Sequence, residues 1–570
     1  GIRDLRMSRG SEMCIRDRLY LGYLKNSFVK LLNKSYVKKL LKSCVLQKWK
    51  EYLMTRKNKN AKYITAAIAA AAAIAGAITG CNSSPAGNGD AGTANQDTET
   101  TPVETTEFVP EIAGVYEAED AEFTGNVKAD KEKPGYSGTG YAAGFSADDD
   151  ACEFSIDIKE NGFYDLVFTT ASNGGYKENY VFVDGESVGN IASENSSFTD
   201  TAVNRVYLET GTHEILVQKY WGWIMLDKLT VQTSKPIDES IYNVSAELVN
   251  KNAAESAKRL MSYLTDIYGE KILSGQYCDT GQFGKECAVV NKVTGKYPAV
   301  LGLDFIEYSP SRVENGSTSK ATDYAKSFWE NGGIVTFCWH WNAPSKYLTG
   351  EWWSGFRTES TNINLAKIMN GEDEEGYELL MKDIDAIAQQ LLILQEADVP
   401  ILWRPLHEAS GGWFWWGASG AEAYKQLYIL LYDKLTNEYG LNNLIWLWNG
   451  QDADWYPGDE YVDIIGEDIY PGEHVYTSQV NKFLEAVDYT QGKMVVMSEN
   501  GCVFDPELAK RDGAMWGLFC TWGTEFVAKN TSIYSYSEQY TEKDMLKKAY
   551  DSDIVLTLDE LPDLKEYPIK

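Results

Sequence analysis

The residues VPILWRPLHE, at positions 399–408, form an apolar run that ends on two ionisable side chains. The run is rich in large apolar side chains, which is typical of a strand buried on both faces of a sheet. It ends at His407 and Glu408, and a carboxylate directly after so apolar a segment is costly unless it has a partner or a task. The pattern therefore predicts a buried parallel strand with a functional acid at its carboxyl end.

Seven other segments of the chain are also runs of apolar or β-branched residues. The eight apolar or β-branched runs lie at residues 271–277, 297–305, 332–341, 399–408, 443–449, 462–470, 493–500 and 514–522. Amphipathic helical patterns separate them, for example at 375–396 and 421–438, where leucine and isoleucine recur on one stripe. Eight strand–helix repeats within about 325 residues predict a (β/α)8 TIM barrel over residues 245–570.

Polar and aromatic residues stand at the carboxyl ends of these runs, where a barrel builds its active site. They are His340, His407, Glu408, Asn449, Tyr470, Glu499 and Trp522. Glu408 ends the fourth run and Glu499 ends the seventh. Two carboxylates over one barrel mouth suit glycoside hydrolysis, in which one protonates the leaving oxygen and the other attacks the anomeric carbon.

The segment before the predicted barrel has a different sequence pattern. Residues 113–233 consist of short alternating runs broken by Gly, Asn and Asp, and they predict a β-sandwich of the jelly-roll type. Expected strands lie at 163–169, 180–183, 205–208 and 214–218. Residues 234–244, which contain Pro236, are predicted to be a linker.

The N-terminal part carries a pattern typical of export. Basic residues from Arg56 to Lys62 precede the apolar run Tyr63–Ile78, which is shorter than the ~20 residues of a membrane span. Its ending, ITGC, resembles a bacterial lipobox. This resemblance implies a signal peptide over residues 54–80, a lipid on Cys81, and a protein anchored in the bacterial cell envelope.

Two flanking segments are predicted to have no fold of their own. Residues 1–53 precede the signal pattern and are read as non-native upstream sequence. Residues 81–112 are rich in Gly, Ser, Thr and Asn, have few large apolar side chains, and are predicted to be a flexible tether.

The composition narrows the choice of partners. The 570-residue chain has a formal charge of −30, and its basic residues concentrate before Cys81, so the remaining body is strongly acidic and predicts no nucleic-acid partner. The 17 Trp and 36 Tyr residues exceed what cores need and suit the apolar faces of sugars. No CxxC pair occurs among the nine cysteines, which argues against a zinc site and leaves disulfide pairing open.

Three motifs of the barrel region resemble glycoside hydrolase family 26. They are WRPLHEASGGWFWWG at residues 403–417, MSENG around Glu499 and TFCWHWN around His340. The family is dominated by retaining endo-β-1,4-mannanases, so the resemblance implies hydrolysis of mannan, glucomannan or galactomannan. It implies β-mannan polysaccharides and manno-oligosaccharides as partners and no cofactor for catalysis.

The resemblance also implies a role for each matching residue. Glu408 would be the general acid/base and Glu499 the nucleophile. The expected substrate-binding residues are His340, His407, Trp413, Tyr470 and Trp522. Among them, Tyr470 would hydrogen-bond the nucleophile, Trp522 would form the floor beneath the sugar, and Trp413 a platform on the leaving-group side. Asp304 is expected either to make a rim hydrogen bond or to contact the sugar.

The predicted sandwich resembles a carbohydrate-binding module of family 35. The motifs are VYEAED at 115–120, GYSGTGYAAGF at 135–145 and YWGWIMLDKL at 220–229. The resemblance implies a structural Ca²⁺ held by Glu117, Glu119 and Asp227, whose hard oxygens suit that ion. It places the sugar site in loops that carry Tyr141, Asn173, Trp221 and Trp223.

Three alternatives are open at this level. The same fold and glutamates would also serve a β-1,3-1,4-glucanase or a β-1,3-xylanase, because the geometry at the sugar C2 hydroxyl is not visible in a sequence. A non-catalytic glycan-capturing surface lipoprotein would lack one of the two glutamates. A transport-associated sugar-binding lipoprotein would need a two-lobed fold, against which eight strands argue. The oligomeric state is left open.

Overall fold

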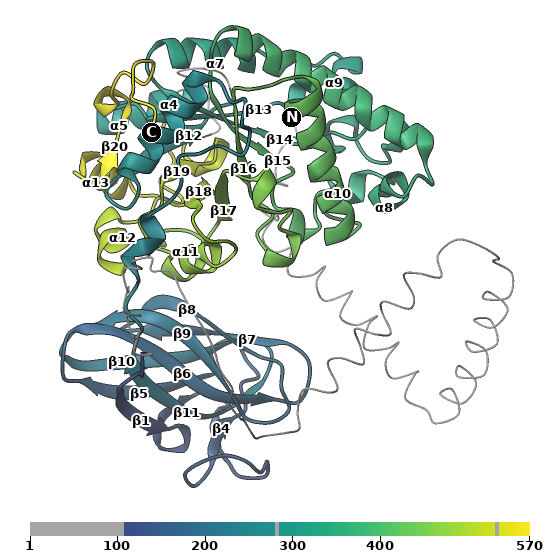
Figure 1. Cartoon of the computed structure of the whole chain (residues 1–570). Coiled ribbons are helices and arrows are strands. Elements are labelled where there is room, and N and C mark those ends of the chain that lie inside the picture. The colour runs from purple at the N-terminus through teal and green to yellow at the C-terminus, as the bar shows by residue number, and fades with distance from the viewer. Residues whose placement is uncertain (1–107, 280–283, 530–534) are drawn as a thin grey trace, which may run out of the picture. The chain divides into compact units, whose positions relative to one another are not determined.

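The structure, a computed structural model, describes residues 108–279, 284–529 and 535–570 (Figure 1). The expected signal peptide, the lipidated Cys81 and all but the end of the expected tether lie outside these residues. Within the described ranges, no helix combines the length and the apolar character needed to cross a membrane.

Residues 112–233 form two antiparallel sheets, as predicted for a β-sandwich. One sheet has the order β3-β4-β11-β6-β9 with β1 added on β11, and the other has the order β2-β5-β10-β7-β8. The strands are β1 Ile112–Glu117, β2 Glu122–Thr124, β3 Lys128–Asp130, β4 Tyr141–Ala143, β5 Ala151–Ile158, β6 Gly162–Ser172, β7 Lys177–Val183, β8 Glu186–Ser193, β9 Thr199–Leu208, β10 Gly211–Trp221 and β11 Ile224–Thr233. The four strands expected from the sequence lie inside β6, β7, β9 and β10, so these predictions are confirmed.

The core of the sandwich lies between its two sheets because alternate side chains of each strand point inward. Along β5 the buried positions include Cys152, Phe154, Ile156 and Ile158, while Ser155 and Asp157 between them are exposed. This period of two is the signal that the sequence shows for these strands.

The second domain is a closed parallel barrel, as predicted. Its strand order is β13-β14-β15-β16-β17-β18-β19-β12, and pairing of β12 with β13 closes the ring. The strands are β12 Ile272–Tyr277, β13 Val300–Asp304, β14 Ile334–Trp339, β15 Ile401–Pro405, β16 Leu444–Trp448, β17 Ile464–Ile469, β18 Met494–Asn500 and β19 Leu518–Thr521. Each lies inside one of the eight predicted runs. A short strand, β20 (Val555–Leu556), also pairs with β12.

Helices alternate with the barrel strands (Figure 1). They are α4 Glu255–Ile267, α5 Lys285–Thr294, α6 Pro310–Glu314, α7 Ala321–Glu330, α8 Leu365–Met369, α9 Glu374–Glu396, α10 Ala421–Tyr432, α11 Val480–Val487, α12 Pro506–Asp512 and α13 Lys543–Asp551. The helix predicted at 375–396 is α9, which begins after Asp373, whose carboxylate accepts from the Gly376 N–H. The pattern at 421–438 is α10 followed by a π-helical segment, Asp433–Glu438.

Most of the tryptophan in this chain serves the core, which corrects the interpretation of the composition. Nine of the 17 tryptophans are buried: Trp329, Trp339, Trp341, Trp403, Trp415, Trp416, Trp446, Trp448 and Trp516. Large rings fill the space between the strands and the surrounding helices efficiently. The number of aromatic residues therefore says less about sugar binding than the positions of the exposed ones.

A buried acid on α9 makes the stability of the barrel depend on pH. Burial raises the pKa of Asp383 to about 8, although its carboxylate accepts a hydrogen bond from Trp341 Nε1 at 2.7 Å. Because the folded-state pKa lies above the unfolded value of about 3.9, the stabilisation is complete below the unfolded pKa and is lost as pH rises through about 8.

We expect Asp383→Asn to remove this pH dependence, since the amide stays neutral and can still accept from Trp341. Between its unfolded and folded pKa values, the wild-type Asp383 should lower the free energy of unfolding by about 1.4 kcal/mol for each pH unit. Thermal melts at about pH 5 and about pH 9 should therefore show a smaller drop in Tm for the variant than for the wild type. Asp385→Asn, on the same helix, is the control and should keep the wild-type slope. An unchanged slope in Asp383→Asn would contradict the burial argument.

Candidate active site

The acid that follows β15 is held by a sharply turned backbone. The strand ends at Pro405, and both Leu406 and Glu408 have positive φ angles, 54° and 52°. Such angles are uncommon outside glycine and cost free energy, so surrounding contacts must hold them. One contact is the Glu408 N–H, which donates to the carbonyl oxygen of Asn449 at 2.8 Å. The turn sets the Glu408 side chain beside carboxylates from other strands.

Three carboxylates meet at this end of the barrel. One oxygen each of Glu408, of Asp468 in β17 and of Glu499 in β18 lies within 4.8 Å of the other two. Retaining glycosidases hold their two catalytic carboxyl groups about 5–5.5 Å apart, whereas inverting enzymes leave more room for a water molecule. The short separation of Glu408 and Glu499 fits a retaining reaction.

Arg404 ties two of these acids together from within β15. The side chain is completely buried, Nη1 donates to Asp468 and to Asn449 Oδ1, and Nη2 donates to Glu499 Oε2 at 2.6 Å. Tyr277 Oη accepts a further bond from Nη2 at 3.0 Å. Burial alone would lower the pKa of Arg404, but Asp468, Tyr277 and Glu499 raise it, so the guanidinium stays charged beside Glu499.

Tyr470 contacts the second oxygen of the same carboxylate. It follows β17, and its hydroxyl donates to Glu499 Oε1. Burial and the charges of Glu499 and Glu408 raise the pKa of Tyr470, so the phenol keeps its proton and remains a donor. Both Glu499 oxygens therefore accept hydrogen bonds, Oε2 from Arg404 and Oε1 from Tyr470, and these bonds fix the position of the carboxylate. This is the contact that the resemblance implies for Tyr470.

Glu408 has the opposite electrostatic environment. Its pKa is raised well above the ordinary value by burial and by the charges of Asp468 and Glu499. Trp413 Nε1 donates to Glu408 Oε2 at 2.7 Å, and this bond works in the opposite direction by favouring the ionised form. Since Oε2 accepts from the indole, Oε1 is the oxygen free to carry a proton. Two nearby carboxylates with divergent environments are the arrangement of an acid and a nucleophile.

We expect Trp413→Phe to move the alkaline limb of the pH profile of kcat/KM to higher pH. Loss of the indole N–H removes a bond that favours ionised Glu408, so the pKa of Glu408 rises. A hydrogen bond to a charged group is worth about 1.5–3 kcal/mol, which predicts a shift of about one pH unit or more. Trp353→Phe, at an exposed position, is the control. An alkaline limb unmoved by Trp413→Phe would show that the indole does not tune this acid.

His340 and His407 form a second polar group beside the acids. Their Nε2 atoms are 3.2 Å apart, and Asp304 Oδ2 lies 2.6 Å from His340 Nδ1. Burial and the charge of Arg404 lower the pKa of His407 well below its usual range, so this ring is neutral. Burial alone would raise the pKa of Asp304, but the interactions with His340 outweigh burial and lower it. Of the two roles expected for Asp304, the structure shows the hydrogen bond, which orients His340.

The aromatic residues near the acids differ in exposure. Trp413 and Trp522 are half-buried, and the Trp522 ring lies 4.8 Å from Tyr277 and 5.6 Å from His340, measured between ring centroids. Trp415 and Trp416 are fully buried, so they pack the barrel and do not line a subsite. Trp413 and Trp522 are thus the tryptophans that could contact a sugar here.

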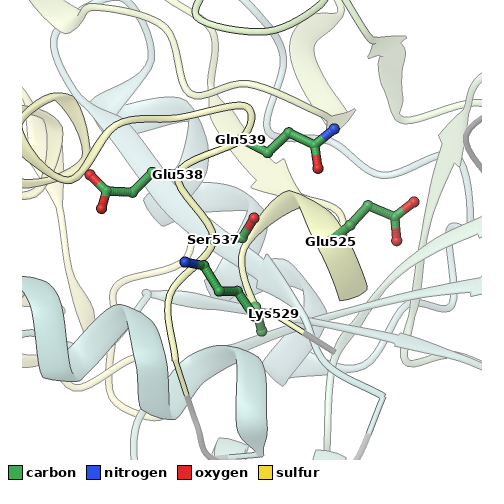
Figure 2. A pocket seen from close by; sticks show the side chains of 6 residues that line it. Glu525, Lys529, Ser537, Glu538 and Gln539 are labelled. Atoms are coloured by element: carbon green, nitrogen blue, oxygen red, sulfur yellow. The ribbon is translucent and has the colours of Figure 1, made fainter. Parts of the chain in front are cut away.

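A pocket lies in the segment that follows β19. It has a volume of about 480 Å³ and is lined by Glu525, Ala528, Lys529, Ser537, Glu538 and Gln539 (Figure 2). Phe526 in this segment packs against Tyr470, with ring centroids 5.2 Å apart. Neither Phe526 nor Tyr470 lines this pocket, which is therefore distinct from the carboxylate cluster.

The residues expected to bind calcium come together in the sandwich. Ser137 Oγ donates to Glu117 Oε2 at 2.8 Å and to Asp227 Oδ2 at 3.0 Å, and the Thr139 N–H donates to Glu119 Oε1. Glu119 Oε2 is buried and lacks a hydrogen-bond partner within the described residues. Three carboxylates with an unsatisfied oxygen fit a hard divalent cation such as Ca²⁺.

The expected sugar-binding residues of the sandwich fall into two groups. Trp221 and Trp223 are 37% and 60% exposed, and Asn173 is also exposed. Ile224 pairs with Ser172, which places Trp223 next to the Asn173 loop. Tyr141 is only 2% exposed, and its ring packs against Tyr136 and Phe198. We therefore correct the expectation for Tyr141, because a buried ring offers no face to a ligand.

Sequence reasoning missed Arg404, Asp468 and Tyr277 as members of the site. A signal for Arg404 was present, since an arginine inside an apolar strand must have buried partners. Its partners could not be named, because they come from strands distant in the sequence. Asp468 stands in the run at 462–470, where Glu467 beside it is equally acidic and does not join the cluster.

A closed parallel barrel that holds two carboxyl groups close together at its carboxyl end, one of them an acid whose pKa is raised, defines a glycoside hydrolase of the retaining type. Comparison with known proteins agrees. Residues 249–560 match the sequence model of glycosyl hydrolase family 26, and residues 114–234 match that of carbohydrate binding module family 35. The chain belongs to glycosyl hydrolase family 26 and carries a family 35 module.

Similar proteins cover both domains. A mannan endo-1,4-β-mannosidase of Thermothelomyces thermophilus is 40% identical over 79% of this chain and 90% of its own length. Mannan endo-1,4-β-mannosidase B of a Piromyces species is 35% identical over 78% of this chain and 77% of its own length. Among solved structures, a Podospora anserina GH26-CBM35 β-(1,4)-mannanase is 39% identical, with a TM-score of 0.56 over 80% of this chain and 99% of its own.

Proposed function

We propose that this protein is a retaining endo-β-1,4-mannanase that hydrolyses mannan, glucomannan or galactomannan. The observation that carries the reaction type is the pairing of Glu408, whose pKa is raised, with Glu499, which accepts from Arg404 and Tyr470. The choice of mannan rests on the relatives, several of which bear the name mannan endo-1,4-β-mannosidase.

In the first step, Glu499 attacks the anomeric carbon while Glu408 gives its proton to the leaving glycosidic oxygen. Arg404 and Tyr470 hold the Glu499 carboxylate in position for the attack. Glu408 is ready for its role because burial and the charges of Asp468 and Glu499 keep it protonated.

In the second step, water hydrolyses the glycosyl ester on Glu499. The ester carries no charge, so one of the two carboxylates that raised the pKa of Glu408 no longer acts on it. Glu408 can then take a proton from the attacking water. The same residue serves as acid and as base because the charge next to it changes between the steps.

The half-buried aromatic rings and the histidines complete the sugar site. Trp522, packed against Tyr277, forms the floor beneath the reacting sugar, and Trp413 forms a platform on the leaving-group side. His340, which is partly exposed, would contact the sugar, and the buried His407 would orient the His340 ring, since their Nε2 atoms are 3.2 Å apart. Trp413 has a second task, since its N–H also orients the acid.

The sandwich would hold the polysaccharide on Trp221, Trp223 and Asn173 and would carry a structural Ca²⁺ on Glu117, Glu119 and Asp227. Calorimetric titration with Ca²⁺ is expected to give a Kd of about 10⁻³ M or tighter, and Glu119→Gln should abolish it. Glu122→Gln, an exposed neighbour, is the control. Full Ca²⁺ binding by Glu119→Gln would contradict the assignment of this site.

Trp223→Ala should weaken retention on insoluble mannan without changing hydrolysis of short oligosaccharides.

The location of the protein belongs to the same proposal. Residues 54–80 would direct export, and Cys81 would be lipidated and hold the protein in the bacterial cell envelope, with residues 82–112 as the tether. The basic run, the short apolar run and the ITGC ending support this. In a bacterial host, Cys81→Ser is expected to move the chain from the membrane fraction to the soluble fraction. An unchanged distribution would argue against the lipid.

The substrate is tested by incubating the purified protein with mannan, lichenan and β-1,3-xylan and counting new reducing ends. We expect release chiefly from mannan. Release chiefly from lichenan or xylan would keep the two glutamates and the mechanism and replace the substrate. If no new reducing ends appear on any of the three polysaccharides, the proposed enzymatic activity would be wrong, and a glycan-capturing protein would be the remaining interpretation.

A further inference from the structure

Two cysteine thiols meet where β12 ends and α5 begins. Cys278 follows the last residue of β12, Tyr277, and Cys287 lies in the first turn of α5. Their Sγ atoms are 2.6 Å apart, and both side chains are buried. The sequence alone left the pairing of its cysteines open, and the fold brings these two together.

We propose that Cys278 and Cys287 are joined by a disulfide in the mature protein. A disulfide forms only where two side chains already approach each other, because backbone movement to bring them together is costly. Here the two sulfurs are in contact; Cys278 directly follows barrel strand β12, and Cys287 lies on helix α5. The bond would close a ring from residue 278 to residue 287.

The other cysteines of the described residues have different surroundings. Cys152 lies in the core of the sandwich, Cys338 has His340 Nδ1 as a neighbour at 3.9 Å, and Cys502 donates to the Tyr540 carbonyl at 3.0 Å. Cys520 is buried on β19. The contact at 2.6 Å therefore distinguishes the proposed pair.

The reaction is a thiol–disulfide exchange. Each thiol loses a proton, one Sγ–Sγ bond forms, and two electrons pass to an oxidising disulfide, which is thereby reduced to two thiols. The thiolate is the attacking species, and burial, together with the neighbouring Cys287, raises the pKa of Cys278 well above its usual value. The bond must therefore form while the chain folds, before the pair is buried. In the cell this step rests on the proposed export, since such oxidants act outside the cytosol.

The bond would stabilise one wall of the active site. Tyr277, the neighbour of Cys278, contacts Arg404 through its hydroxyl and Trp522 through its ring. Arg404 in turn holds Glu499. Pinning the end of β12 to α5 restricts the movement of Tyr277, so the effect of the bond should be seen first in resistance to heat.

The first test locates the bond chemically. The full chain is unfolded, reduced and refolded in a glutathione redox mixture, so that the result does not depend on export. It is then alkylated and digested without reductant for mass spectrometry. We expect a peptide pair joined through Cys278 and Cys287 that separates on reduction. Separate alkylation of both residues in the refolded chain, or a link from Cys287 to Cys520, would overturn the proposal. A link found after refolding but absent from cell-derived protein would contradict the proposed export and would leave the pairing of Cys278 with Cys287 standing.

The second test measures stability. Chain refolded with the bond is expected to melt about 5 °C above chain refolded under reductant, in the range that closing a short ring predicts. The double variant Cys278→Ser/Cys287→Ser should melt at the lower temperature under both conditions. Cys152→Ser is the control and should keep the difference. A wild-type Tm that is the same in both preparations would contradict a stabilising bond.

Discussion

Glu499→Gln is expected to lower kcat on mannan by at least about 10⁴-fold, because an amide cannot form the glycosyl ester. The replacement keeps the size of the side chain and leaves the amide oxygen to accept from Arg404, while the Tyr470 hydroxyl can accept from the new NH2 group, so the fold should persist. Reducing-end assays measure the loss, and a Tm close to that of the wild type confirms folding. KM should change little, since the amide still fills the site.

Glu485→Gln is the matched control for this substitution. Glu485 lies on α11, is exposed, and pairs with Lys482; it is not a member of the carboxylate cluster. Its replacement should leave kcat within about twofold of the wild type. If Glu499→Gln kept a tenth or more of the wild-type rate, Glu499 could not be the nucleophile, and Asp468 would become the candidate because it lies in the same cluster.

Glu408→Ala is expected to separate the two steps of the reaction. On mannan, whose leaving group needs a proton, kcat should fall by about 10²–10⁴-fold. On an aryl mannoside with a strongly acidic phenol as leaving group, the first step needs no acid and should remain fast. The second step lacks its base, so the glycosyl enzyme should accumulate and give a burst of phenol followed by a slow steady state.

Mass spectrometry of Glu408→Ala during that steady state should show a mannosyl adduct on the peptide that contains Glu499. The double variant Glu408→Ala/Glu499→Gln should give neither burst nor adduct. An equal loss of rate on both substrates, without a burst, would mean that Glu408 acts by binding and not by proton transfer.

The barrel and its acid were predictable because the signals are local. Each barrel strand is a continuous apolar run, and an abrupt end on Glu408 or Glu499 is visible within ten residues. Four strands of the sandwich were visible for the same reason, since inward and outward positions alternate along strands such as β6 and β7. What the residues themselves could not supply was the substrate, which came from the resemblance.

The interior of the site was not predictable because it depends on strand register. Arg404 reaches Asp468 and Glu499 only because β15, β16, β17 and β18 lie side by side in the closed sheet. Tyr141 shows a related limit. Its sequence surroundings resemble those of an exposed loop aromatic, but packing against Phe198 buries it. Long-range packing decides such cases, and no short window of sequence contains it.

Proton NMR of the first sugar released from a manno-oligosaccharide tests the central claim most directly. Double displacement through Glu499 inverts the anomeric carbon twice, so the new reducing end must appear first as the β anomer and convert to the α anomer only by mutarotation. We predict that the β signal rises first. Early appearance of the α anomer would show a single displacement by water and would contradict the assignment of Glu499 as nucleophile.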